Sequence, residues 1–215
     1  MKIDARGRRG LRAVRHGAAA LGLLVGLAAC GSGGGAPSSP PVARGGLAVG
    51  QSLAGQKPVE TLTGQPTSLA LGRRATVVVL MATWCRYCGY EDRWVVPGLV
   101  GQPGVAVDLV DVSPYGGIAS PGPQSPPFSG QDHIGKKTTV AGMRAWMARY
   151  AAQYGLPPGV HLYVAPSETQ ASWKVASYPT IVLLDGSGTV RRVIAGAFTS
   201  SKAALGAVQQ VESGT

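Results

Sequence analysis

An apolar run passes directly into a pair of cysteines in the segment Val77-Val78-Val79-Leu80-Met81-Ala82-Thr83-Trp84-Cys85-Arg86-Tyr87-Cys88. Residues 75–82 are rich in β-branched side chains without polar alternation, which predicts a strand buried on both faces. We expect a helix over residues 85–96, closed by Pro97 and Gly98. Unpaired N–H groups at a helix start favour a thiolate, so the segment predicts a reactive thiol where strand turns into helix.

Two thiols at this spacing suit disulfide exchange. A thiolate at Cys85 would attack a disulfide, and Cys88 would then resolve the mixed disulfide. Cys85 is the expected nucleophile because it lies at the helix start, where it is the more exposed of the two. Paired cysteines also occur in zinc sites, but the chain has no second pair, and His133 and His161 are far away in sequence. No metal site and no cofactor are therefore predicted.

The first thirty residues have the form of an export signal. Residues 2–15 are basic, and residues 17–29 are apolar but too short to span a bilayer, which takes about 20 residues, so residues 1–29 predict a signal peptide. The stretch Leu27-Ala28-Ala29-Cys30-Gly31 resembles the lipobox of bacterial lipoproteins. That resemblance implies cleavage before Cys30, acylation of its sulfur and anchoring to a bacterial membrane, facing the periplasm or the cell exterior. An ordinary secreted protein is the alternative.

Residues 30–50 combine the lipidated cysteine with a segment rich in Gly, Pro and Ser, which predicts a flexible tether. The folded domain is expected over residues 51–215. The chain of 215 residues has a formal net charge of +10. Half of this charge belongs to residues 1–29, and the domain has no basic cluster interleaved with aromatic side chains, so a nucleic-acid partner is not expected.

Strand and helix patterns alternate along the domain. This alternation predicts an α/β fold with helices on both faces of a mixed sheet, preceded by short strands. Residues 113–138 form an insertion rich in Pro and Gly, interpreted as disorder or a passive surface loop in preference to a substrate-binding lid. We expect extended pieces within 59–71 around a turn at 64–66, strands at 105–112, 161–165, 178–185 and 189–195, and helices at 140–154, 168–175 and 200–212.

Residues 51–212 resemble the thioredoxin superfamily, and more narrowly the bacterial membrane-anchored thiol–disulfide oxidoreductases of the cytochrome c maturation type. The resemblance rests on the cysteine pair after the central strand, on Glu91 three residues past Cys88, on Tyr178-Pro179-Thr180 before a strand, and on Gly196. It implies a thioredoxin-like three-layer sandwich with an N-terminal β extension.

The resemblance also implies roles for single residues. A cis Pro179 would present the backbone of Tyr178 to an extended substrate, which Thr180 would also contact. Glu91 would take a proton during resolution or tune both thiols; a solvated helix carboxylate is the alternative. The other expected substrate contacts are Trp84, Arg86 and Tyr87, of which Arg86 would also favour the thiolate by its charge.

The chain departs from the family at two positions. The proline of the active-site helix usually lies about five residues past the second cysteine, whereas Pro97 lies nine past it. The buried acid that cytosolic thioredoxins carry six residues before the first cysteine is Val79 here. Proton transfer must then come from elsewhere.

Taken together, these features predict a monomeric thiol–disulfide reductase that acts on exported protein disulfides and is recycled by a membrane electron donor. An oxidase or isomerase of the same fold is the first alternative. A copper-delivering lipoprotein that uses both thiolates as ligands is the second, and a redox-silent binding lipoprotein is the third.

Overall fold

The computed structural model describes residues 46–120, 122 and 130–214. The predicted signal peptide, Cys30 and most of the predicted tether lie outside the described residues. Within the described part of the chain, no helix is both long and apolar enough to cross a bilayer. The first described residues lie against the domain, because the Gly50 N–H donates to the Val190 carbonyl at 2.8 Å.

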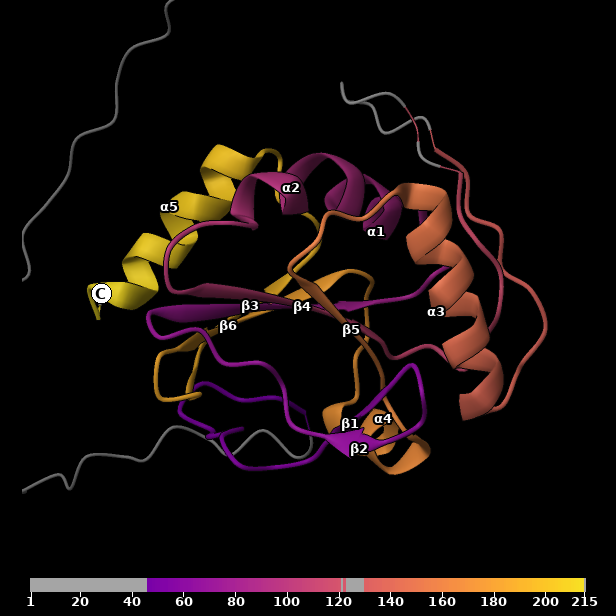
Figure 1. Cartoon of the computed structure of the whole chain (residues 1–215), viewed down its shortest axis with the longest axis horizontal. Helices are drawn as coiled ribbons and strands as arrows, with labels where there is room; N and C mark the ends of the chain where they lie inside the picture. Colours follow the sequence, from indigo (N-terminus) through magenta and orange to yellow (C-terminus); the bar gives the residue numbers. More distant parts are fainter. Residues whose placement is uncertain (1–45, 121, 123–129, 215) are drawn as a thin grey trace, which may run out of the picture. The chain divides into compact units, whose positions relative to one another are not determined.

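A mixed sheet of seven strands forms the centre of the fold (Figure 1). Its order is β2-β1-β5-β4-β3-β6-β7. The strands are β1 (Val59–Thr61), β2 (Pro66–Thr67), β3 (Ala75–Met81), β4 (Val105–Asp111), β5 (Val160–Val164), β6 (Thr180–Asp185) and β7 (Val190–Ala195). The helical segments are α1 (Arg86–Tyr90), the π-helix η1 (Glu91–Val95), α2 (Val96–Leu99), α3 (Val140–Tyr154), α4 (Ser167–Trp173) and α5 (Ser201–Glu212).

Strand β3 is central in the sheet: it pairs with a strand along each edge, and its apolar side chains are covered on both faces. It pairs parallel with β4 and antiparallel with β6, and all seven of its residues are buried. Strands β6 and β7 form the predicted hairpin. The predicted α/β class and the mixed sheet are confirmed. The elements that begin within about two residues of the expected positions are β3, β4, β5, β6, β7, α1, α3, α4 and α5.

The two faces of the sheet are covered differently. One face packs against α1, α2, α3 and α5, and its core includes Val77, Val79, Met147 and Val208. The other face packs against α4 and the N-terminal segment, and its core includes Trp173. This gives the three layers of a thioredoxin-like sandwich, with β1 and β2 as the N-terminal β extension (Figure 1).

The helix after the cysteine pair runs further than its sequence predicts. It does not close at Pro97 and Gly98 but continues through them to Leu99. A wide turn precedes the proline, in which the Val96 N–H donates to the carbonyl of Glu91, five residues earlier. Proline lacks an N–H and is tolerated in the first turn of a helical segment, so Pro97 lies in the first turn of α2 and does not end the helix.

Residues 113–120 and 130–138 of the insertion form an extended strap. Its two arms pair at Tyr115 with Lys137 and at Ser120 with Gln131. They run along α3 and reach the segment that carries the cysteines (Figure 1).

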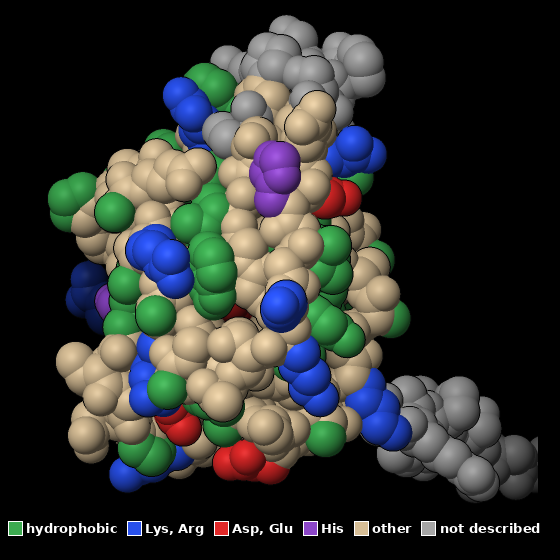
Figure 2. Space-filling model, turned by 90° about the vertical axis from the view of Figure 1, so that its right-hand side faces the viewer, with side chains coloured by type: hydrophobic (Ala, Val, Ile, Leu, Met, Phe, Trp, Pro, Cys, Tyr) green, Lys and Arg blue, Asp and Glu red, His purple; other side chains and the backbone are tan. Residues whose placement is uncertain are grey.

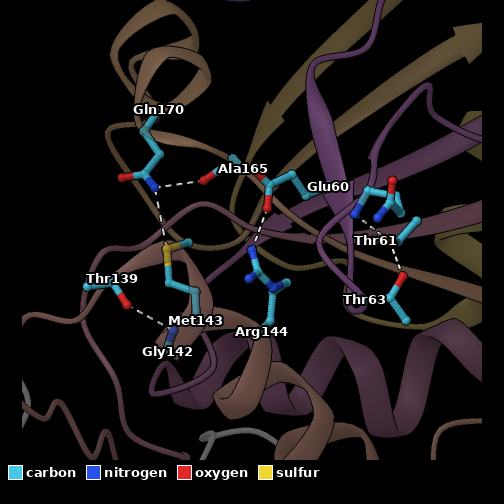
Figure 3. A network of polar contacts seen from close by, with 10 residues as sticks. Glu60, Thr61, Thr63, Thr139, Gly142, Met143, Arg144, Ala165 and Gln170 are labelled. Atoms are coloured by element: carbon cyan, nitrogen blue, oxygen red, sulfur yellow. Dashed lines mark hydrogen bonds and ion pairs between the residues drawn. The ribbon is translucent and has the colours of Figure 1, made fainter.

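Helix α3 is held at its first turns by polar contacts (Figure 3). The Thr139 hydroxyl accepts a hydrogen bond from the Gly142 N–H, which caps the helix start. The Arg144 guanidinium forms an ion pair with Glu60 of β1 at 2.5 Å. These contacts fix α3 beside the sheet, and its buried tyrosines then face the active-site helix.

Candidate functional site

Cys85 lies at the junction between β3 and α1, as its sequence predicts. Its backbone is extended, and its sulfur accepts a hydrogen bond from the Cys88 N–H at 3.5 Å, so the sulfur itself caps the helix start. The pKa of the Cys85 thiol is lowered, first because the Cys88 thiol donates to its sulfur and also because backbone N–H groups of Cys88 and Tyr87 favour the anion. Burial acts in the opposite direction.

Cys88 is fully buried on the inner side of α1. Burial, together with the hydrogen bond to Cys85 and the charge there, raises its pKa well above the ordinary value. The two thiols therefore differ in the way that disulfide exchange requires, because one forms a thiolate readily and the other keeps its proton. Both cysteines are free thiols in this structure.

Cys85 is less exposed than expected for an attacking residue, with only 4% of the residue's surface accessible. Two segments border it. One is the loop before β6, where the Tyr178–Pro179 peptide bond is cis and the Tyr178 carbonyl lies 3.5 Å from the Cys85 sulfur. Thr180 follows at the start of β6 and donates to the Ser177 carbonyl at 2.8 Å.

The strap borders the cysteine pair on another side. The Ala119 N–H donates to the Thr83 carbonyl at 2.9 Å, and the His133 N–H donates to the Trp84 carbonyl at 3.0 Å. The Asp132 carboxylate accepts from the Arg86 N–H at 2.7 Å, at the first residue of α1. The strap is thus bonded to the backbone on both sides of Cys85, which its composition did not reveal.

Arg86 and Tyr87 lie together beside the strap. The Arg86 guanidinium stacks over the Tyr87 ring, with 4.9 Å from its central carbon to the ring centroid. It also donates to the Gly130 carbonyl at 3.5 Å and to the Tyr87 hydroxyl at 3.3 Å. The expected contribution of Arg86 to the thiolate stays a prediction, since these contacts direct its charge to the strap and to the ring.

Trp84 is half-buried and connects the cysteine loop to its neighbours. Its ring meets the Tyr178 ring edge to face, with 5.6 Å between centroids. Its indole N–H donates to the Ser113 hydroxyl at 2.8 Å. The sequence-predicted residues Trp84, Cys85 and Tyr178 are therefore brought into one cluster by β3, the strap and the loop before β6.

Two consecutive carboxylates, Glu91 and Asp92, are buried one turn beyond Cys88. The alternative that Glu91 is a solvated helix carboxylate is wrong, because its side chain has no exposed surface and accepts from the Phe198 N–H at 2.8 Å. Burial and the charge of Asp92 raise the pKa of Glu91 to about 8. The sequence analysis missed Asp92, whose carboxylate accepts from the Tyr150 hydroxyl at 2.6 Å.

Basic side chains are frequent on the face of the domain formed by α3 and the strap. Figure 2 shows Lys and Arg spread over the face formed by α3 and the strap, with acidic side chains at its margins. The strap and α3 contribute Lys136, Lys137, Arg144 and Arg149 against the single acid Asp132. In the described part of the chain, no three His, Cys, Asp or Glu side chains gather as a metal site.

Comparison with known proteins shows likeness at the level of fold. No family model matches the chain, and no curated protein matches it in sequence. A candidate electron transport protein from Aquifex aeolicus is similar in structure, with a TM-score of 0.53, 16% identity, and coverage of 78% of this chain and 100% of that protein.

Two further structures are similar over much of the chain. A thioredoxin-like protein from Aeropyrum pernix has a TM-score of 0.47 and 18% identity, over 71% of this chain and 87% of its own. The exposed lipoprotein thioredoxin of Streptococcus pneumoniae has a TM-score of 0.43 and 19% identity, over 71% of this chain and 96% of its own.

Proposed function

We propose that this chain is an exported, membrane-anchored thiol–disulfide oxidoreductase that works as a reductase on extracytoplasmic protein disulfides. The observation that carries the proposal is the unequal thiol pair. Cys85 caps the start of α1 with its sulfur and has a lowered pKa, while Cys88, three residues later, is fully buried and has a raised one. The thioredoxin-like fold supplies the strand, the helix start and the cis-proline loop around this pair.

The reaction proceeds in two exchanges. The Cys85 thiolate attacks one sulfur of the substrate disulfide, a new sulfur–sulfur bond forms, and the other substrate sulfur leaves as a thiolate. Cys88 then loses its proton and attacks the Cys85 sulfur, which releases the second substrate thiolate. Two electrons pass to the substrate, and the Cys85–Cys88 disulfide is reduced again by a dithiol donor at the membrane.

One charge of the strap, that of Asp132, acts in the reductive direction. The Asp132 carboxylate lies at the first residue of α1 and opposes the negative charge of a Cys85 thiolate. A less stabilised thiolate makes the dithiol form less stable relative to the disulfide, and the pair is then the stronger reductant. The hydrogen bonds from Cys88 and Tyr87 lower the pKa of Cys85 and act in the oxidising direction, so the reduction potential decides between reductase and oxidase.

The membrane anchor rests on the sequence of residues 1–30. The basic start, the short apolar stretch and the lipobox-like ending at Cys30 support export and acylation. One acyl chain binds a membrane only marginally, so stable anchoring needs the two chains that diacylation supplies. Incorporation of a radioactive fatty acid into the wild type and not into Cys30→Ala tests this part of the proposal.

Trapping of mixed disulfides tests the exchange activity. A Cys88→Ser variant keeps the nucleophile and lacks the resolving thiol, so it should hold exported proteins in disulfides with Cys85. The matched Cys85→Ser variant should hold none. Capture by Cys85→Ser alone would reverse the two roles, and capture by neither would remove the exchange function.

Separate measurements distinguish the reductase from the oxidase, from copper delivery and from a redox-silent role. A reduction potential near the roughly −270 mV of thioredoxin fits the reductase, whereas one near about −120 mV fits an oxidase. Tight Cu(I) binding with negligible reduction of insulin would indicate copper delivery. An unchanged phenotype in a Cys85→Ser strain would indicate a redox-silent role.

A further inference from the structure

The resolving thiol needs a proton acceptor inside the protein. Cys88 has no accessible surface, so water does not take its proton directly. Strand β3 supplies no acid for this purpose, since Val79 occupies the position six residues before Cys85. The acceptor must therefore be a buried base close to α1.

Two buried carboxylates meet that description, and their hydrogen bonds differ. Glu91 directs one oxygen to the Phe198 N–H on the loop after β7. Asp92 directs one oxygen to the Tyr150 hydroxyl on α3. In each case the second carboxylate oxygen is buried and has no hydrogen-bond partner among the described residues.

Asp92 is the carboxylate that interacts with the thiols. It follows Cys88 by four residues, and residues at this spacing lie on the same side of a helix. The charge of Asp92 contributes to the raised pKa of Cys88, and the charge of Cys85 contributes to the raised pKa of Asp92. We propose that the Asp92 carboxylate accepts the proton of Cys88 during resolution and that Tyr150 positions the carboxylate for this transfer.

Tyr150 is suited to a positioning role because it is itself fixed. It is fully buried and stacks on Tyr154, with 4.2 Å between ring centroids. The Tyr154 hydroxyl donates to the Ala119 carbonyl at 2.9 Å, which connects the pair to the strap. Burial raises the pKa of both tyrosines, so both keep their protons and act as donors.

The groups around Asp92 set the pH at which it can accept a proton. The charged and titratable groups that act on it are Cys85, Cys88 and Glu91 from its own segment and Tyr150 and Tyr154 from α3. Burial, opposed by the Tyr150 hydrogen bond, raises the pKa of Asp92 to about 7. A carboxyl group with this value exchanges protons readily at neutral pH.

The transfer is balanced within the resolving step, and it rests on the proposed exchange function. The Asp92 carboxylate takes the proton from the Cys88 sulfur, and the resulting thiolate attacks the Cys85 sulfur. A bond forms between the two cysteine sulfurs, and the bond from Cys85 to the substrate sulfur breaks. The electron pair leaves with the substrate thiolate, which takes a proton from Asp92 or from water.

Stopped-flow reaction of the reduced full chain with Ellman's reagent separates the two exchanges. The first release of thionitrobenzoate reports attack by Cys85, and the second reports resolution by Cys88. We expect Asp92→Asn to slow the second phase by about 10-fold or more and to remove its pH dependence around neutral pH, since general bases contribute at least this much. The first phase should change little, which also shows that the variant is folded.

Two further variants distinguish proton transfer from structural support. Tyr150→Phe removes a hydrogen bond that lowers the pKa of Asp92, so the midpoint of the second phase should move to higher pH while the phase persists. Asp108→Asn removes another buried carboxylate, one that pairs with His161 on the sheet, and should leave both phases unchanged.

The outcomes separate the two proposals. Absence of the first phase in the wild type would remove the exchange function itself. A normal first phase with an unaltered second phase in Asp92→Asn would overturn only the role of Asp92. Slowing by Glu91→Gln without slowing by Asp92→Asn would assign the proton to Glu91 and would overturn the proposal as well.

Discussion

The Cys85 sulfur lies 3.5 Å from the carbonyl oxygen of Tyr178, a residue 93 positions later in the chain. Cys85 lies in the turn between β3 and α1 and Tyr178 lies in the loop before β6, and strands β3 and β6 are antiparallel neighbours in the sheet. The sheet therefore brings the thiol to the cis-proline loop, and a substrate that reaches one must also contact the other.

Removal of the negative charge of Asp132 should make the thiol pair more oxidising. In Asp132→Asn the side-chain oxygen can still accept from the Arg86 N–H, but the negative charge that opposes the Cys85 thiolate is gone. We expect a lower pKa of Cys85 and a less negative reduction potential, measured by equilibration with glutathione at low salt, where surface charges are least screened.

Glu168→Gln is the matched control for that measurement. It removes one exposed acid from the first turn of α4, on the opposite side of the sheet. Its potential should equal that of the wild type. A potential for Asp132→Asn that is unchanged or more negative would show that the strap does not tune the pair.

A side chain at Gly89 should destabilise the fold. An added Cβ would overlap the Tyr154 hydroxyl, which packs directly on α1. Overpacking of this kind costs about 1–3 kcal/mol, so Gly89→Ala should lower the unfolding free energy in urea by that amount. Gly206→Ala in α5 has open space around its Cβ and should instead raise it by about 0.5–1 kcal/mol.

Stability should fall as the pH rises toward neutrality, in part because of Glu91. Its pKa is about 8 in the folded protein, against 4.5 for an ordinary glutamate. Between these values the folded state holds a proton that the unfolded state has released, so each rise in pH favours unfolding. The effect is at most about 1.4 kcal/mol per pH unit for one group.

Urea unfolding between about pH 5 and 7 checks this prediction. Glu91→Gln cannot ionise and keeps an oxygen for the Phe198 N–H, so its unfolding free energy should fall by about 2–2.5 kcal/mol less than that of the wild type over this range. Equal pH slopes for the two proteins would mean that Glu91 is ionised in the folded state.

Local patterns in the sequence were enough to predict the strands and the position of the thiol pair. The apolar run over residues 75–82 has no polar alternation because β3 is buried on both faces, and the pair follows where this strand ends. The end of the helix that follows Cys85 could not be predicted in the same way. A π-turn before Pro97 has no sequence signal of its own, and it lets the proline start a new turn.

The environment of the site depends on contacts between segments far apart in the chain. From the sequence alone, Asp92 would be taken for a surface residue of a helix. The position of α3 brings Tyr150 to Asp92 and buries both side chains. The strap reads as a loop rich in Pro and Gly, because its pairing with the Thr83 and Trp84 carbonyls is made by backbone N–H groups. Such backbone pairing leaves no trace in side-chain composition.

The pH dependence of Cys85 alkylation tests the proposed chemistry most directly. The reduced full chain is treated with iodoacetamide over a range of pH, and mass spectrometry follows the peptides that carry Cys85 and Cys88. We expect Cys85 to react with a midpoint below the roughly 8.5 of an ordinary cysteine, with Cys88 protected throughout. A midpoint at or above that value, or faster reaction of Cys88, would contradict the assignment of Cys85 as the activated nucleophile.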